Sequence, residues 1–279
     1  MRIRTYGVVR GVMLKHPPTR LSALRIAGSI MANDRETERL DKYICSVTSF
    51  TRSVLGKEIR KRGASLNGKQ IKDPSVKVRE GDVIEIAGME ITVSLKPVYL
   101  MMNKPAGVVS ANSDDSYDTV FSLLPERYAR CHCVGRLDID TEGLLLITDD
   151  GQWSHMITSP AKGVRKVYRA VLASDFSDEA VSRIRNGIEL RGEKEPAFAE
   201  VTKVGPLTWD FAVTEGRYHE IKRIAAAAGS SVTALRRLSI GALSLDESLA
   251  PGMYRELDAN EILLPLANSS SSDEDGRGS

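Results

Sequence analysis

The sequence predicts an α+β protein with two domains, and three observations support this. The chain has 279 residues, enough for one sizeable hydrophobic core and a small second domain. Two helical periods and a hairpin pattern precede a short linker at Leu95–Pro97, and strand-like runs recur from there to about residue 266. We therefore divide the chain into an extension (1–37), a small domain (38–96), a larger domain (97–267) and a tail (268–279).

The composition is that of an ordinary water-soluble protein, with 42% hydrophobic and 27% charged residues. No apolar run approaches the roughly 18 to 20 residues that span a bilayer, so no membrane association is expected. The three cysteines are too few for a disulfide framework, which favours a reducing, cytoplasmic location. The net charge of +2 indicates nothing by itself, and its distribution must be considered.

The extension is basic and has no acidic residue up to position 33. This bias is typical of an organelle transit peptide. Met31 begins a segment that resembles a natural start, so an upstream start codon or a flexible basic arm explains the extension equally well. The tail, which is serine-rich and then acidic, has nothing to bury and is expected to be disordered.

The small domain begins with two predicted helices. In the first, from Arg39, the apolar residues Leu40, Tyr43, Ile44 and Val47 share one face. The second begins at Thr51 or Ser53, capped by the hydroxyl, and continues to Arg62 with Val54, Leu55 and Ile59 facing inward. Gly63 ends it. Asn67-Gly68 then predicts a tight hairpin, and Val76, Val78, Val83 and Ile86 supply further short strands.

Positive charge is concentrated between residues 51 and 80, which contain nine Lys or Arg residues and three acidic residues. Lys57, Arg60 and Arg62 of the second predicted helix belong to this group. Such a basic face suits the phosphate backbone of a nucleic acid, although a solvated surface explains the charge alone equally well.

In the larger domain, the most informative run is Gly135–Thr148. It places Asp138 beside Arg136 at the start of a hydrophobic strand that is expected to be buried. A carboxylate held at such a place is a candidate nucleophile or base. Asp140 would share its face on an extended chain and competes for that role. Asp149–Gly151 predicts a turn after the strand.

Cys131-His132-Cys133 resembles a metal-binding sequence, but a closed zinc site needs four ligands. On a strand, the two thiols would share one face and His132 the other, so we interpret them as buried thiols. No metal is expected.

The run Gly135–Thr148 resembles the pattern G-R-L-D-x-x-T-x-G-L-L-L-x-T of the pseudouridine synthases that modify ribosomal RNA. The small domain resembles the S4-like RNA-binding domain that precedes the catalytic domain in part of this family. The resemblance covers residues 38 to 265. It implies a mixed, largely antiparallel sheet in the larger domain, RNA as the partner of the basic face, and no cofactor.

The resemblance also implies roles for individual residues. Asp138 corresponds to the catalytic aspartate, which attacks the sugar carbon or removes a sugar proton; the two routes remain open. Tyr168, in a Lys-x-Tyr motif, packs on the uracil, and its hydroxyl can transfer protons. Lys222 pairs with the aspartate and keeps it ionised. Arg136 enters the RNA stack where the target nucleotide leaves it, because the enzyme must extrude that nucleotide to reach its sugar.

Further roles follow from the third and first motifs. Arg237 is a candidate RNA contact, and Ile240 a candidate apolar wall beside the uracil. His219 is expected to be structural or to contact RNA. Glu220 departs from the Gln that the pattern usually has at this position. Asn103–Ser110 matches the first motif, Asn-Lys-Pro-x-Gly, and is expected to act as scaffold.

Two runs, Asp150–Pro160 and Leu249–Arg255, favour the subfamily that isomerises uridine 516 of 16S ribosomal RNA. The expected partner is that RNA or a pre-30S assembly intermediate, and the expected state is a monomer. The alternatives are a synthase that acts on a single site of 23S ribosomal RNA, a non-catalytic assembly factor, and a glycosidic hydrolase that uses Asp138 and Asp140.

Overall fold

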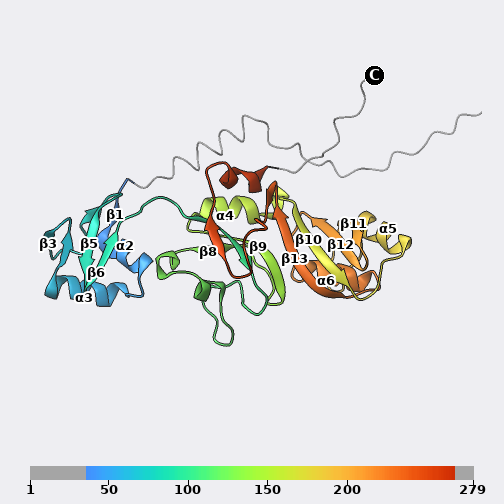
Figure 1. The fold of residues 1–279 in the computed structure, drawn as a ribbon, viewed down its shortest axis with the longest axis horizontal. Helices are drawn as coiled ribbons and strands as arrows, with labels where there is room; N and C mark the ends of the chain where they lie inside the picture. The colour runs from blue at the N-terminus through green and yellow to red at the C-terminus, as the bar shows by residue number, and fades with distance from the viewer. Residues whose placement is uncertain (1–35, 268–279) are drawn as a thin grey trace, which may run out of the picture.

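The computed structural model describes residues 36–267, and the expectations for the extension up to residue 35 and for the tail from residue 268 lie outside them. The small domain and the larger domain lie side by side along the long axis of the molecule (Figure 1). No helix in the described part of the chain is both long enough and apolar enough to cross a membrane.

The small domain packs two helices against short strands. Its elements are β1 (Glu38–Arg39), α2 (Leu40–Val47), α3 (Arg52–Arg62), β2 (Ala64–Leu66), β3 (Lys69–Ile71), β4 (Lys77–Val78), β5 (Val83–Ile86) and β6 (Met89–Thr92). The strands β3-β2-β5-β6 form one antiparallel sheet, and β1 pairs with β4. Leu40, Ile44, Leu55 and Ile59 are fully buried in its core, as the helical periods predict.

The hairpin predicted at Asn67-Gly68 is present, with both residues at positive φ (52° and 75°), as this two-residue turn requires. Two details of the sequence prediction for the second helix were wrong. Val54 is 55% exposed, because it lies on the solvent side of α3. Thr51 precedes α3, but no side-chain hydroxyl caps the helix.

The larger domain is built on one mixed sheet. Its strands are β7 (Tyr99–Lys104), β8 (His132–Val134), β9 (Thr141–Thr148), β10 (Lys166–Leu172), β11 (Glu200–Gly205), β12 (Thr208–Val213), β13 (Val232–Ile240), β14 (Leu243–Ser244) and β15 (Tyr254–Glu256). Its helices are α4 (Gly151–Thr158), α5 (Asp178–Asn186) and α6 (Glu220–Ala227), and a 3-10 helix at Glu261–Leu266 closes the described chain.

The order in the sheet is β11-β12-β10-β13-β9-β7-β15, with β14 on β13 and β8 on β9. All pairings in it are antiparallel except the parallel pair β9–β13, so the expected mixed, largely antiparallel sheet is confirmed. Gly143 makes this parallel pair possible. A Cβ at Gly143 would lie 2.3 Å from the carbonyl oxygen of Arg237, and φ at Gly143 is +100°.

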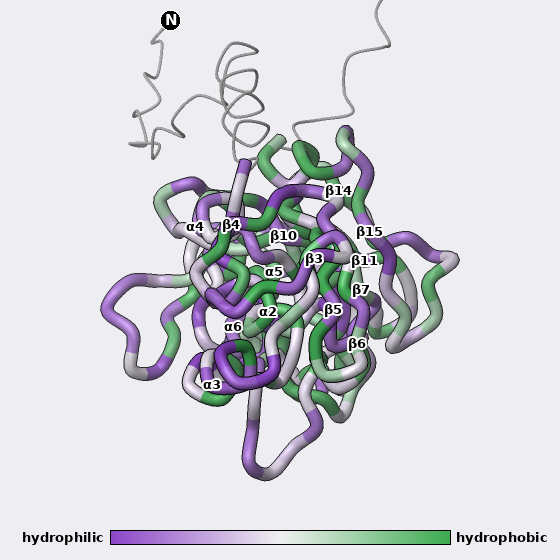
Figure 2. Tube along the Cα trace, turned by 90° about the vertical axis from the view of Figure 1, so that its left-hand side faces the viewer, coloured by the Kyte–Doolittle hydropathy of each residue, from purple (hydrophilic) through white to green (hydrophobic). Residues whose placement is uncertain are grey.

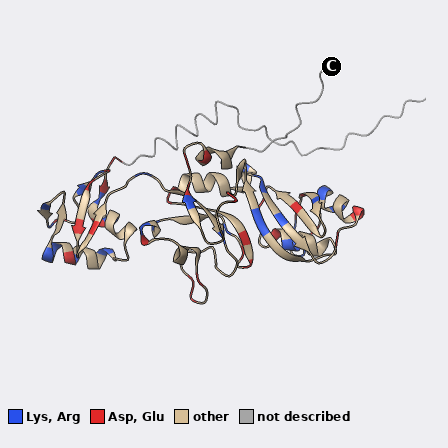
Figure 3. Cartoon of the chain, in the orientation of Figure 1, with Lys and Arg blue, Asp and Glu red and all other residues tan. Residues whose placement is uncertain are grey.

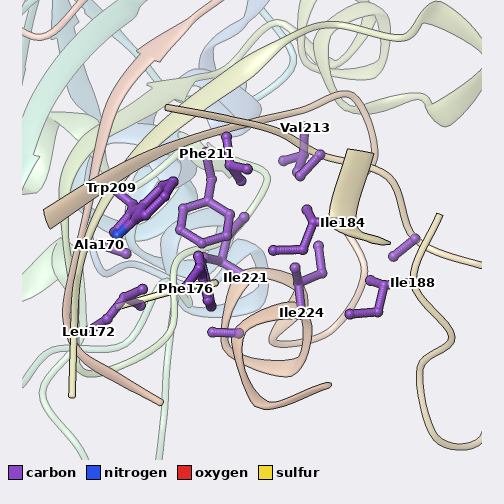
Figure 4. Packing of buried hydrophobic residues seen from close by; sticks show 14 of the residues in the cluster. Ala170, Leu172, Phe176, Ile184, Ile188, Trp209, Phe211, Val213, Ile221 and Ile224 are labelled. Atoms are coloured by element: carbon purple, nitrogen blue, oxygen red, sulfur yellow. The ribbon is translucent and has the colours of Figure 1, made fainter. Parts of the chain in front are cut away.

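The helices pack on different parts of the sheet, and each part has its own hydrophobic core. Around β10 to β13, Ile221 and Ile224 of α6 pack against Phe176, Trp209 and Phe211, as Figure 4 shows. This packing fixes the rotation of α6. Around β7 and β9, Trp153 of α4 is fully buried. The turn predicted at Asp149–Gly151 opens α4, because the Asp150 carboxylate accepts hydrogen bonds from the backbone N–H groups of Gln152 and Trp153.

The linker is bonded to the larger domain. The Arg130 guanidinium donates hydrogen bonds to the carbonyls of Ser94 (3.2 Å) and Lys96 (3.1 Å), and its Nε lies 3.1 Å from Asp149 Oδ2. The backbone N–H of Ser49 donates to Glu126 Oε1 at 2.7 Å. The two domains are therefore joined by specific contacts as well as by the chain.

Candidate active site

A polar pocket opens where the two parts of the sheet meet. The space inside it, which includes open solvent, is about 430 Å³. It is lined by Arg136, Leu137, Asp138, Thr141, Tyr168, Gly216, Arg217, His219, Glu220, Ile221 and Leu235. These residues come from the loop before β9 and its first residue, from β10, from the loop before α6 and the start of that helix, and from β13.

The carboxylate of Asp138 is held by groups from α6. Its Oδ2 accepts a hydrogen bond from Lys222 Nζ at 2.9 Å, and its Oδ1 lies 3.5 Å from His219 Nε2. Lys222 also binds Asp140 Oδ1 at 2.6 Å, but the Asp140 side chain is 65% exposed and does not line the pocket. Between the two competing carboxylates, the geometry therefore favours Asp138.

The same contacts shift the pKa values of the neighbouring groups. Burial lowers the pKa of Lys222, but hydrogen bonds and charges from Asp140 and Asp138 outweigh this effect and raise it above its ordinary value. The hydrogen bond from Lys222 lowers the pKa of Asp140. Lys222 is therefore a charged ammonium at neutral pH.

Buried groups hold the backbone on either side of Asp138. Ser110 Oγ donates to the carbonyl of Leu137 and accepts from its N–H, at 3.0 and 3.1 Å. Lys104 is fully buried, and its Nζ donates to the carbonyls of Asp138 (3.0 Å) and Thr141 (2.9 Å). Burial lowers the pKa of Lys104 to about 8, although the charges of Asp140 and Asp138 oppose that shift.

Tyr168 lines the pocket, and a buried arginine supports it. Arg237 Nη1 lies 3.3 Å from the Tyr168 hydroxyl, and its guanidinium carbon lies 5.8 Å from the ring centroid. Arg136 also lines the pocket, and it forms no ion pair with Asp138 or with any other residue among those described. Its charge is therefore available to a ligand.

Comparison with known proteins shows the family to which the chain is related. The model of the RNA pseudouridylate synthase family matches residues 98–227. The ribosomal small subunit pseudouridine synthase A of Salmonella typhimurium is 41% identical over 228 residues, which cover 80% of this chain and 98% of that protein. The protein of the same name from Vibrio parahaemolyticus is 42% identical, over 80% of this chain and 97% of its own.

The chain belongs to the RNA pseudouridine synthase family. A crystal structure of a pseudouridylate synthase, 41% identical, matches with a TM-score of 0.59 over 81% of this chain and 99% of the other. The expected synthase fold is thus confirmed. The chain is an enzyme of the isomerase class.

Two residues of this pseudouridine synthase do not lie where the sequence predicted. Arg237, expected to contact RNA, is 2% exposed, and its Nε donates to the carbonyl of Leu144. Its position indicates support for Tyr168. Ile240, expected beside the uracil, is buried in the other core with Leu243 and does not line the pocket. Leu235 and Ile221 supply apolar lining instead.

Cys131 of the synthase is buried, as expected for a thiol, and Cys133 is half-buried. Burial raises their pKa values to about 12 and about 11. No group of three or more His, Cys, Asp or Glu residues within residues 36–267 is arranged to hold a metal ion.

Sequence reasoning did not give the positions that three residues near Asp138 occupy in the synthase. Lys104 was assigned only to a scaffold motif, although a single lysine at the end of a hydrophobic strand is a signal for a buried contact. His219 lies beside Asp138. Glu220 is 7% exposed and lines the pocket, and burial raises its pKa to about 7, with the charge of Glu215 adding to the shift.

The raised pKa of Glu220 predicts a pH-dependent stability. Between its ordinary pKa of 4.5 and about 7, the folded protein holds a proton that the unfolded chain releases. The stabilisation is thus complete below pH 4.5 and is lost as pH rises through 7. Glu220→Gln has a neutral side chain at every pH and does not lose this stabilisation. We therefore expect the difference in free energy of unfolding, variant minus wild type, to be about 2 kcal/mol larger at pH 8 than at pH 5.

Urea unfolding of both proteins at the two pH values measures this difference, since all other titrating groups are shared. Glu189→Gln changes an exposed carboxylate and serves as the control. An equal difference between Glu220→Gln and wild type at both pH values would show that Glu220 is ionised in the folded protein throughout this range.

Proposed function

We propose that this synthase isomerises a single uridine of 16S ribosomal RNA, uridine 516, to pseudouridine in the cytoplasm, and that it acts as a monomer. Its substrate is the naked RNA or a pre-30S assembly intermediate. The small-subunit target is supported by the names of the relatives that align with 80% of the chain. The observation that carries the proposal is the carboxylate of Asp138, held by Lys222 at the wall of a polar pocket.

The reaction breaks the bond between C1′ and N1, turns the uracil, and joins C1′ to C5, while the proton on C5 is lost and N1 gains one. No atom is gained or lost overall. The sugar carbon becomes electron-poor when the first bond breaks, as in other glycosidic cleavages, and a carboxylate stabilises it. In our proposal Asp138 supplies this carboxylate. Lys222 stabilises the negative charge and fixes the orientation of its oxygens.

The other pocket residues have roles that follow from their positions. The Tyr168 ring is held by Arg237 and faces the pocket, so it packs on the detached uracil, and its hydroxyl can transfer protons. Arg136 fills the place that the extruded uridine leaves in the RNA stack. Ile221 and Leu235 exclude water from the reacting base.

The small domain, in this proposal, is an S4-like domain that binds the RNA backbone. Lys57, Arg60 and Arg62 of α3 are exposed. Figure 3 shows several Lys and Arg residues in the small domain, at one end of the molecule. Seen from that end, most of α3 is hydrophilic (Figure 2). Arg62 forms an ion pair with Glu58 at 2.9 Å. Lys57 and Arg60 have no carboxylate partner among the described residues.

Replacing Lys57, Arg60 and Arg62 together by Gln is expected to weaken RNA binding and its dependence on salt. Removing one lysine or arginine from a phosphate lowers the slope of log affinity against log salt by about 0.7 to 0.9, so the triple variant loses about 2 to 3 units of slope. Filter binding of a 16S transcript from low to high salt measures it. Lys162→Gln, at an exposed lysine of the larger domain, serves as the single-charge control. A triple variant with the wild-type slope would place the phosphates elsewhere.

Pseudouridine mapping of ribosomal RNA tests the function itself. RNA from cells that lack the gene is treated with carbodiimide and read by reverse-transcription stops, before and after wild type or Asp138→Asn is re-supplied. We expect one stop in 16S RNA to disappear and to return only with wild type. A change in 23S RNA would keep the chemistry and replace the target, and no change at all would favour a non-catalytic assembly factor.

A further inference from the structure

Tyr218 is an exposed aromatic residue at the rim of the pocket. Its neighbours Arg217 and His219 both line the pocket, whereas Tyr218 itself is 76% exposed. One face of its ring stacks on the His219 imidazole, with the centroids 3.8 Å apart and the planes at 21°. Since the imidazole covers only one face, the high exposure means that the other face is open to solvent.

The position of this ring is fixed by the surrounding chain. His219 has the left-handed backbone conformation (φ 50°) at the start of α6, which turns the chain sharply there. The Arg217 guanidinium donates to the carbonyls of Glu195 and Pro196, at 2.8 and 3.0 Å. The carbonyl of Tyr218 accepts from Arg223 Nη1 at 3.4 Å. These contacts hold the backbone that carries the ring, and stacking on His219 orients the ring itself, so little further freedom is lost when a ligand binds.

The stacked pair leads directly to the reacting group, because His219 Nε2 lies 3.5 Å from Asp138 Oδ1. A nucleotide whose sugar reaches Asp138 brings the next nucleotide of the strand to the rim. Extrusion of the uridine takes one stacking neighbour from that base, and an aromatic ring is a surface on which unstacked bases bind.

We propose that the open face of Tyr218 binds the nucleobase next to the isomerised uridine by stacking. The ligand class is an unpaired base of any identity, because every base presents a π-face. This inference rests on the proposed function for the presence of RNA in the pocket. It adds a substrate-binding residue that acts in affinity and not in the chemical step.

Tyr218 has one competing role, which is to brace His219 beside Asp138. The two roles differ in the quantity that a substitution changes. Substituting a stacking residue raises the dissociation constant of the RNA and leaves the rate of the bound complex unchanged. Substituting a residue that only holds His219 in position lowers that rate and leaves the dissociation constant unchanged.

The test compares four variants of the full chain: Tyr218→Ala, Tyr218→Leu, Tyr218→Phe and Tyr218→Trp. Leu keeps an apolar side chain without a π-face, so it separates stacking from simple hydrophobic contact. Tyr117→Ala, at an exposed tyrosine that does not line the pocket, is the control. For each protein, filter binding of a 16S transcript gives the dissociation constant, and single-turnover pseudouridine formation at saturating RNA gives the rate.

We expect Ala and Leu to raise the dissociation constant about tenfold, the usual effect of losing one stacked base, and Phe and Trp to stay within about twofold of wild type. The salt slope is expected to stay unchanged, since the cationic groups that bind phosphates are all retained. Wild-type affinity for Ala, equal affinities for Leu and Phe, or a slower single turnover at unchanged affinity would overturn the proposal. If wild type binds but forms no pseudouridine, the proposed function fails, while the binding series still decides the role of Tyr218.

Discussion

Asp138→Asn is expected to abolish pseudouridine formation while RNA affinity stays within a few-fold of wild type. The amide is nearly isosteric with the carboxylate and keeps an oxygen that can accept the hydrogen bond of Lys222, so the pocket retains its shape. It lacks the negative charge that the electron-poor sugar carbon requires. We expect the single-turnover rate to fall by a factor of at least about 10⁴, because the group that reacts with the sugar is removed.

The matched control is Asp140→Asn, since Asp140 binds the same Lys222 but lies outside the pocket. We expect less than a tenfold loss in its single-turnover rate. Binding of a 16S transcript and tritium release from C5-labelled uridine measure affinity and rate on the same preparations. If Asp138→Asn turns over normally, or if Asp140→Asn is the inactive variant, the assignment of the carboxylate is wrong.

Lys104→Met is expected to reduce activity by about a hundredfold, because a displacement of about 1 Å at a reacting group has that effect. Methionine fills the space of the lysine stem but donates no hydrogen bond. The buried carbonyl of Thr141 then loses the hydrogen bond from Lys104, at about 1 to 3 kcal/mol, while the carbonyl of Asp138 keeps the hydrogen bond from the N–H of Thr141 at 3.1 Å. Removing a buried charge offsets part of this loss, so the expected net destabilisation is about 2 kcal/mol.

Urea unfolding and single-turnover assays separate the two effects. Lys162→Met makes the same substitution at an exposed lysine, where we expect neither to change appreciably. A Lys104→Met protein that is destabilised but fully active would mean that Lys104 does not position Asp138.

Much of the site was predictable from the sequence, because its central residues belong to a long local pattern. The run from Gly135 to Thr148 marks a buried strand with an acidic residue at its start, and Asp138 lies there. The small domain was predictable where periodicity is strong, as for Leu40 and Ile44, and where one dipeptide determines a turn, as for Asn67-Gly68. Each of these features depends on residues that are close in the chain.

The remainder depends on contacts between residues that are distant in the chain. Lys104 reaches carbonyls 34 and 37 residues away, and no local pattern reveals where a buried ammonium finds its acceptors. The position of Arg237 depends on an irregularity in pairing. The register of β10 with β13 shifts between Val167 and Tyr168, which places Arg237 opposite Tyr168. A sequence that shows an exposed-looking arginine in a basic motif does not reveal this shift.

The single parallel pairing in the sheet also bears on how an unfinished molecule behaves. Asp138 comes from the chain before β9, and Lys222 comes from the chain before β13, 84 residues later. Contacts of such long sequence separation form late, because a large loop must close first. The small domain, by contrast, is held together by contacts of much shorter range. A partly folded chain can therefore present its basic helix before it possesses a catalytic centre. Catalytic activity then shows that both halves of the sheet have joined.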